Sequence, residues 1–437
     1  MKYLKKFNTI TEYDQFKSGS DFVLPNVSYV EKIKDVAFSP NKYDYLTIEA
    51  LEDDFSVSVF PNTYEYRIGT SGEWKTLNAY EYTDPVNSGE LIQFRGKTFE
   101  NGTYPNVYTE TAGVADFKIM NDKQFNLKGT VMSMLYGLVN DHKSCVDLTE
   151  SGFDYNVFDS MFKNCVGLKS VSRDFLPATT LADYCYQNMF SGCSSLTRTP
   201  KLPAMKLTYS CYSCMFDQCT SLTTAPELPA TTLRTYCYNS MFNGCSSLTV
   251  APKLNARDLT DAFGCYQSMF ANCTSLVKAP KLPATILDRC CYDSMFYKCT
   301  NLTTAPELPA TVLKSSCYSF MFWGCTSLTT APELPAMHVL DACYQAMFEE
   351  CVSLVEAPEL QAITWEDDQW GGFSGYNRMF MGCSNLNYIK MHLQNFNRNI
   401  YLFTNGVSTN GTFIKSETSN LSIGKNGIPE GWTVINI

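Results

Sequence analysis

The stretch CTSLTTAPELPATTLRTYCYNSMFNG, residues 219–244, is one copy of a unit that repeats along more than half of the 437-residue chain. Its Met-Phe pair occurs nine times at intervals of 26 or 28 residues, with a last interval of 32, and a cysteine follows each pair at a constant offset. A period of this length is typical of a solenoid, in which each unit stacks on its neighbours and cannot bury its apolar side alone. The pairs begin at Met161, Met189, Met215, Met241, Met269, Met295, Met321, Met347 and Met379.

The pattern inside the unit predicts a short strand, a turn and a short helix. Leu222 and Leu228 alternate with polar residues around a proline, as expected for an extended segment followed by a turn. Leu233, Cys237 and Met241 follow a spacing of about 3.6 residues, which predicts one or two helical turns. We therefore expect a mixed α/β solenoid of about nine repeats of 26–28 residues, with strands on one flank and helical segments on the other.

The repeated pattern CxSLxxAPxLPAxxLxxxCYxxMFxx resembles the BspA-like leucine-rich repeats of surface proteins from gut and oral anaerobic bacteria. The resemblance implies a leucine-rich-repeat fold for residues 151–395, but it does not carry over a binding partner. The chain departs from the usual form in its Met-Phe pair and its Ala-Pro-Glu-Leu-Pro segment. Residues 5–40, with LPNVSYV at 24–30, and the C-terminal residues resemble tail-associated proteins of phages and prophages of such bacteria.

The repeats divide the rest of the chain into flanking segments. Residues 43–123 carry short alternating runs separated by turn residues at roughly 8–12-residue spacing, which predicts an all-β sandwich preceding the solenoid. Residues 1–42 read as an arm or attachment segment, and residues 124–150 as a junction and N-terminal cap. After the solenoid, residues 151–395, a C-terminal β cap is expected over residues 396–437, because the last unit otherwise exposes an apolar flank.

Composition excludes several classes of function. Lys and Arg number 34 against 44 Asp and Glu, a net charge of −10, and no basic run is present, so nucleic acid is not expected as a partner. No stretch reaches the roughly 18 consecutive apolar residues of a membrane span, and no signal peptide is visible, so synthesis in the cytoplasm is expected. The three histidines, His142, His338 and His392, lie in unrelated contexts, so neither an enzyme nor a cofactor is expected.

Sixteen of the 19 cysteines fall into two repeat columns, one after Met-Phe and one in the Cys-Tyr pairs. We interpret both columns as buried thiols that pack as small apolar groups; a disulfide framework or a metal site is the alternative. A metal needs ligands that converge on one point, whereas a column spreads equivalent residues along a line. Cys211 and Cys214 form the only CxxC pair, and no second pair or nearby histidine completes a zinc site.

Two positions vary between repeats and could therefore carry recognition. The residue after Met-Phe is Tyr297 in one repeat and Trp323 in the next, with Phe320 nearby, and these would form an aromatic contact site for sugar rings or a protein if they face solvent. The alternative is that they pack under a loop. The strand position after Ala-Pro drifts from mixed to acidic, either as a solvated face or as a binding column: Lys201, Glu227, Lys253, Lys281, Glu307, Glu333 and Glu359.

The last, longest unit contains a further candidate, a loop with two tryptophans around three carboxylates. Trp365, Glu366, Asp367, Asp368 and Trp370 lie in the extra residues of this unit, and insertions in repeats project as loops that contact ligands. Packing against the cap is the alternative. The three adjacent carboxylates lack the interleaved spacing of calcium loops.

Together these features favour a non-enzymatic surface-recognition protein. By resemblance, it is expected to be a phage or prophage tail-associated or receptor-binding protein that contacts a bacterial surface glycan or protein through its solenoid. Residues 1–42 would then attach it to other virion proteins. The alternative is a bacterial cell-surface adhesin of the BspA-like group that binds a host protein or glycan. A glycan hydrolase would need a convergent carboxylate pair, which nothing in the repeats supplies.

Overall fold

A computed structural model gives the fold of the protein. The region from Tyr45 to Ile437 forms one compact unit. The predicted attachment segment, residues 1–42, lies outside the described residues. The described residues are 45–61, 63–96, 116–136, 147–149, 156–365, 375–393 and 400–437.

The N-terminal part of this unit is a six-stranded sheet in the order β4-β3-β5-β1-β7-β8, together with a two-stranded sheet of β2 and β6. The Phe94 and Phe117 rings meet edge to face with centroids 5.2 Å apart, and both residues are fully buried, so the two sheets share one core. The strands are β1 (Leu46–Ala50), β2 (Val57–Phe60), β3 (Tyr64–Ile68), β4 (Lys75–Leu77), β5 (Leu91–Gly96), β6 (Asp116–Ile119), β7 (Phe125–Lys128) and β8 (Leu168–Val171).

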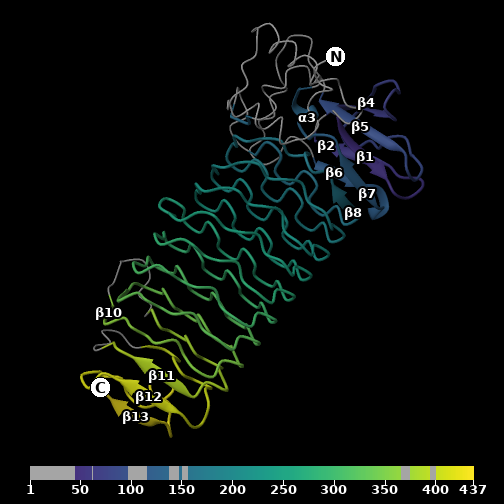
Figure 1. The fold of residues 1–437 in the computed structure, drawn as a ribbon. Helices are drawn as coiled ribbons and strands as arrows, with labels where there is room; N and C mark the ends of the chain where they lie inside the picture. The colour runs from purple at the N-terminus through teal and green to yellow at the C-terminus, as the bar shows by residue number, and fades with distance from the viewer. Residues whose placement is uncertain are drawn as a thin grey trace, which may run out of the picture. The chain divides into compact units, whose positions relative to one another are not determined.

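The six-stranded sheet continues directly into the repeats. β7 pairs antiparallel with β1 on one side and parallel with β8 on the other, and β8 is the extended segment of the first repeat. The Ser170 position of β8 then forms a parallel bridge to Arg198 of the next layer. Figure 1 shows the layers as successive coils that follow β8. The sheet formed by the predicted sandwich segment is therefore continuous with the stack of repeats.

Within the repeats, the extended segments are very short. Neighbouring layers join through single parallel bridges, such as Thr224 to Val250 and Lys278 to Thr304 in one column and Ile286 to Val312 in a second. The Ala-Pro-x-Leu-Pro segment between the two columns explains this, because proline has no N–H to donate and ends each ladder. Pairings longer than a single bridge reappear near the C-terminal end of the stack. They involve β9 (His338–Val339), β10 (Thr364–Trp365), β11 (Tyr388–Met391), β12 (Thr412–Lys415) and β13 (Thr433–Asn436), all in parallel pairs.

The predicted mixed α/β solenoid is wrong, because the second half of each unit is not helical. Tyr236, Ser240 and Gly244 have φ angles of 54°, 51° and 71°, so every fourth residue is left-handed, a conformation that an α-helix excludes. The only helical segments among the described residues are the 3₁₀ turn η2 (Met120–Asp122) and the four-residue α3 (Ser133–Tyr136). A repeat of four residues places Leu233, Cys237 and Met241 on one side just as a helix would, which is why the spacing misled.

The turn segments are held together by hydrogen bonds between layers. The N–H of Tyr238 donates to Cys265 at 3.0 Å and that of Phe242 to Met269 at 2.9 Å, while the intervening Met241 donates within its own turn to Tyr238 at 3.3 Å. Alternate N–H groups thus point to the next layer and to the local turn. The backbone N–H groups of the turn segments therefore find hydrogen-bond partners without a helix or a strand, as a buried backbone requires.

Side chains of one kind form columns through the interior. In the phenylalanine column, Phe216 and Phe242 stack with centroids 5.7 Å apart and planes 5° apart, and Phe270 continues the column with the same geometry. A parallel tyrosine column runs beside it, with Tyr266 and Tyr292 5.6 Å apart. Burial of these aromatic columns, together with methionine and leucine columns, supplies the apolar area that stabilises the stack.

The interpretation of both cysteine columns as buried thiols is confirmed for the described residues. Every cysteine of the two columns is free and buried, while Cys145 lies outside the described residues. The Cys245 thiol donates a hydrogen bond to the carbonyl of Phe216 in the preceding layer at 3.1 Å, and equivalent bonds recur along the column. Burial raises the pKa of Cys299 to about 12, so this thiol stays protonated at neutral pH.

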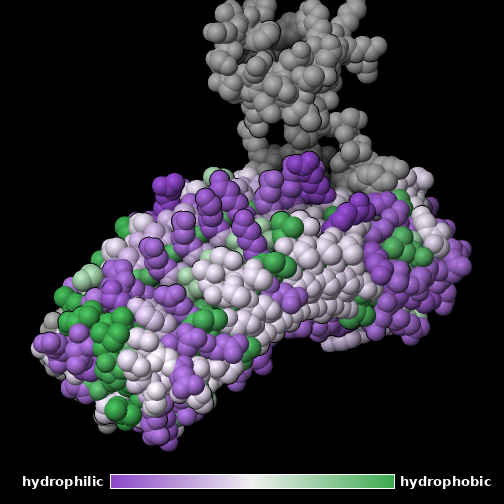
Figure 2. All heavy atoms as spheres, turned by 60° about the horizontal axis from the view of Figure 1, so that its bottom comes forward, coloured by the Kyte–Doolittle hydropathy of each residue, from purple (hydrophilic) through white to green (hydrophobic). Residues whose placement is uncertain are grey.

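No helix in the described parts of the chain is long and apolar enough to span a bilayer. Figure 2 shows one side of the molecule, where weakly polar residues form a broad pale band and strongly apolar residues gather toward the end that carries the C-terminal strands. The exposed large apolar side chains of residues 400–437 include Tyr401, Ile423, Ile435 and Ile437.

Candidate functional site

One exposed column of residues follows the first set of bridges along the stack. Its backbone is paired between layers while its side chains point to solvent, so the fold places few demands on their identity. We call this surface the strand face. It comprises the exposed residues at 197–198, 223–224, 249–250, 277–278, 303–304 and 329–330.

A hollow of about 690 Å³ opens on the strand face across two neighbouring layers. It is floored by small or rigid residues, since Ala279 and Ala305 are half-buried and prolines follow each of them. Alanine leaves room that a larger side chain would fill. The rim carries Lys278 and the hydroxyl groups of Thr303 and Thr304.

Charges from the predicted strand column reach this hollow. Lys281 and Glu307 line it from successive layers, and both are exposed. The two oppositely charged groups and the threonine hydroxyls suit a ligand rich in hydroxyl or amide groups. Among the residues that line this hollow, Glu307 is the only carboxylate, so they do not supply the carboxylate pair that glycoside hydrolysis ordinarily needs.

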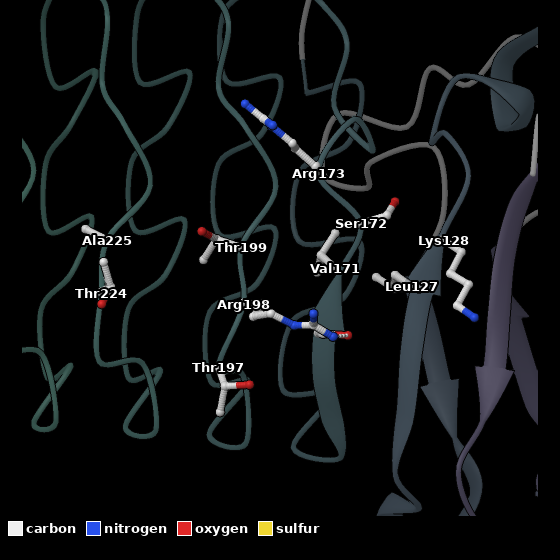
Figure 3. A pocket seen from close by; sticks show the side chains of 11 residues that line it. Leu127, Lys128, Val171, Ser172, Arg173, Thr197, Arg198, Thr199, Thr224 and Ala225 are labelled. Atoms are coloured by element: carbon white, nitrogen blue, oxygen red, sulfur yellow. Dashed lines mark hydrogen bonds between the residues drawn. The ribbon is translucent and has the colours of Figure 1, made fainter.

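A second hollow, of about 520 Å³, lies further toward the N-terminus where the β7–β8 sheet meets the following layers. Figure 3 shows the side chains that line it, with Lys128 on β7, Arg173 just after β8 and Arg198 on the next layer. Thr224 and Ala225 of the following layer complete the lining, so this hollow lies on the same bridge column as the first.

Hydrogen bonds hold part of this second hollow in place. Lys128 forms an ion pair with Glu49 at 2.5 Å, and Asn126 donates to the same carboxylate at 2.8 Å. Burial acts to raise the pKa of Glu49, but the bonds from Lys128 and Asn126 outweigh it and lower that pKa. Ser170 in turn donates to Asn126 at 2.6 Å and accepts a long bond from Arg198 at 3.5 Å.

The predicted aromatic pair lies elsewhere, on the turn segments. Tyr297 and Trp323 stack face to face, with centroids 4.6 Å apart and planes 8° apart, and both are half-buried. The Lys298 ammonium lies 4.9 Å from the Trp323 ring. Phe320 is half-buried at a left-handed turn position with φ 53°. None of the three aromatic residues lines either hollow, and their role in binding stays a prediction.

Of the predicted loop in the last unit, the structure describes little. The backbone of Trp365 forms the end of β10, where it pairs with Val339 of β9. Glu366, Asp367, Asp368 and Trp370 lie outside the described residues. The proposed contact of this loop with a ligand therefore also stays a prediction.

The repeat pattern of the sequence does not reveal the basic lining of the second hollow. Arg173 and Arg198 belong to the first two layers, and Lys128 lies before the repeats, so no repeat column contains all three. A signal was present in the cluster of Lys169, Arg173, Arg198 and Lys201 within an acidic chain.

Comparison with known proteins adds little to this description. No family model matches the chain, and no curated protein matches it. Among solved structures, a chain from a crystal structure of a TLR13–ssRNA13 complex aligns with 11% identity and a TM-score of 0.26. The alignment covers 61% of this chain and 35% of that one, so the present chain spans about a third of its length. A score this low does not establish a shared fold.

Proposed function

We propose that the chain is a non-enzymatic surface-recognition protein that holds an extended ligand along its strand face. The observation that carries the proposal is that both hollows lie on one column of parallel-bridged layers. Layers of this kind are spaced about 4.8 Å apart, so a column of them forms a long, regular docking track. A polysaccharide or an extended peptide matches such a track better than a compact small molecule does.

Rigidity supports the proposal. Interlayer hydrogen bonds and aromatic columns hold the backbone of the stack in place, so the positions from which the strand-face side chains project are fixed. Preorganised surfaces lose less conformational entropy when they bind. The ligand we propose is a glycan or protein of a bacterial surface, bound by a phage or prophage tail-associated protein. The resemblance of the repeats and termini to proteins of gut and oral anaerobic bacteria and their phages supports this finer assignment.

Blocking the first hollow tests the proposal directly. Thr304 lines the hollow, is exposed and takes part in the stack through its backbone, so Thr304→Trp should fill the hollow while the fold persists. We expect the full-length variant to lose at least tenfold in affinity for cells or capsular polysaccharide that the unmodified protein binds. Thr311→Trp, at an exposed position outside the lining, is the matched control and should bind normally.

The outcome separates the alternatives. Normal binding by Thr304→Trp, with loss of binding by Trp323→Ala, would transfer recognition to the turn segments and overturn the strand-face proposal. Binding to host proteins in place of bacterial surfaces would favour the adhesin. Release of reducing sugar from the bound polysaccharide would contradict the non-enzymatic assignment.

A further inference from the structure

We propose that the second hollow, between β7 and the layers that follow β8, is a separate site for an anionic group of a ligand, namely an acidic saccharide. This inference rests on the proposed function, recognition along the strand face, and adds the chemical class of ligand at one position of it. The grounds are the charge of the lining, the hydroxyl groups between the charges, and the local structure that creates the hollow.

The charge of the lining is reversed relative to the chain as a whole. Eleven residues line the hollow; three of them are the cations Lys128, Arg173 and Arg198, and none is acidic. The whole chain has a net charge of −10, so a cluster of cations without a lining carboxylate is not what its composition predicts. Such a cluster attracts anions and discriminates against cationic or neutral ligands.

The nearby acids cancel this charge only in part. Glu49 offsets the charge of Lys128, which leaves Arg173 and Arg198 as the lining cations that no carboxylate of the hollow neutralises. Asp174, next to Arg173, lies 3.9 Å from Lys201 and is exposed. Among the described residues, Arg173 has no ion-pair partner. Arginine is the side chain that best matches the planar oxygens of a carboxylate.

The hydroxyl groups identify the rest of the ligand. Figure 3 shows Arg198 extending toward β8, whereas the Arg173 side chain extends away from Arg198, and Ser172 and Thr199 lie at intermediate positions along the lining. A saccharide ring presents hydroxyl groups around its edge, so serine and threonine side chains suit it, while the flanking cations suit the acidic substituents of the same or adjacent rings. A volume of about 520 Å³ falls within the ordinary range for small-ligand sites.

The hollow has a local structural cause at this one junction. The β7–β8 pairing contains a register shift between Phe125 and Asn126, the irregularity of a β-bulge. Beyond Lys128 the chain turns at Gly129, whose φ is 76°. After Lys128 the chain therefore turns away from the stack. At the equivalent position each later layer continues into its Ala-Pro-x-Leu-Pro segment. No other described layer has a β7 beside it, so the site belongs to this junction rather than to the repeat.

The experiment compares acidic and neutral saccharides on the full chain. Isothermal titration with polygalacturonate oligomers should show binding that weakens as salt rises from 50 to 300 mM, because charge screening increases. Dextran oligomers of the same length should bind at least tenfold more weakly. Polyglycerol phosphate forms a third arm that distinguishes a phosphate from a carboxylate as the anionic group.

Variants locate the site. Arg173→Gln or Arg198→Gln should weaken polygalacturonate binding about five- to tenfold each, and the double variant more. Arg257→Gln removes the same charge from an exposed position outside the hollow and is the matched control. Circular dichroism melting should show all of these variants folded, since the altered side chains are exposed.

Any of three results would overturn the inference. Dextran and the acidic oligomers could bind equally well, the double arginine variant could bind as the unmodified protein does, or Arg257→Gln could lose as much affinity as the arginine variants of the hollow. The proposed function is tested separately: if Thr304→Trp abolishes cell binding while the arginine variants bind normally, only the anionic site is wrong. If the arginine variants fail and Thr304→Trp binds normally, the site in the first hollow is wrong.

Discussion

Replacing Tyr212 by phenylalanine should stabilise the protein, although it removes a polar group from the tyrosine column. Tyr212 is 1% exposed, and its hydroxyl oxygen is buried without a hydrogen-bond partner. The ring stacks between Tyr186 at 5.9 Å and Tyr238 at 6.0 Å, and these contacts do not involve the hydroxyl. The column already accepts phenylalanine, because Phe158 stacks on Tyr186 at 5.7 Å with planes 6° apart.

The expected gain follows from two opposing contributions. A buried hydroxyl without a partner costs about 1–3 kcal/mol relative to its hydration in the unfolded chain. Removing the oxygen of Tyr212 also leaves a small void and forfeits a few dispersion contacts, which offsets roughly 0.5 kcal/mol. We therefore expect Tyr212→Phe to raise the free energy of unfolding by about 0.5–2.5 kcal/mol.

The assay is urea unfolding followed by far-UV circular dichroism, with Tyr66→Phe as the control. The Tyr66 hydroxyl donates to the Asp84 carboxylate at 3.2 Å and accepts from the Asp84 N–H at 3.2 Å, so the same chemical change should there destabilise by about 1 kcal/mol. A lower urea midpoint for Tyr212→Phe would refute the reasoning, since it would show that the hydroxyl has a partner in solution, such as a bound water.

Three further predictions test other parts of the structure. Burial raises the pKa of Asp293 despite hydrogen bonds from Ser294 and from Gln267. The contribution of Asp293 to stability therefore falls as the pH rises from its unfolded pKa, near 4, through the raised folded value. Asp293→Asn should melt at a higher temperature than the unmodified protein at pH 7 but not at pH 4, and a difference independent of pH would contradict this. Cys245→Ala should lower the free energy of unfolding by about 1–2 kcal/mol, because the thiol hydrogen bond is lost and a small cavity is left. Urea titrations under reducing conditions measure this, and an unchanged midpoint would argue against packing as the role of the thiol. Trp323→Ala should lower it by about 1 kcal/mol or more through loss of the aromatic stack; if cell binding also falls tenfold while the melt stays cooperative, the aromatic pair contributes to recognition.

The stacked repeat could be predicted from the sequence because the residues of each interior column recur in it at a fixed period. Each Met-Phe pair and each following cysteine occupies an equivalent buried place in its layer, as Met241, Phe242 and Cys245 do. The helical segment could not be predicted from apolar spacing, since a four-residue turn repeat produces the same spacing. A better signal was available in the glycines Gly244 and Gly324, which share one column and have φ angles of 71° and 69°. Glycine at a recurring position indicates a left-handed residue and therefore argues against a helix.

The candidate site was only partly predictable for a related reason. The charged column that contains Lys281 and Glu307 could be read from the period, and both residues do line a hollow on the strand face. The basic hollow depends instead on the junction of β7 with the first layers, where no period applies. Its residues come from four different segments of the chain, which the β7–β8 pairing and the bridges between successive layers bring together.

The residues that stabilise the stack are different from the exposed residues of the strand face, which suits the recognition role we propose. Non-glycine residues in the left-handed conformation are disfavoured by about 1–2 kcal/mol each, and the turn segments contain them in every layer from Asn156 onward. The interlayer hydrogen bonds and the buried aromatic, methionine and cysteine columns offset that cost, so stability depends on the interior columns and on the turn backbone. The strand face contributes through its backbone bridges, and its exposed side chains range from Arg198 to Thr224, Val250 and Lys278 along one column. Substitutions there would change the chemistry of the surface while leaving the stack intact, and this is the property that the proposed recognition surface needs.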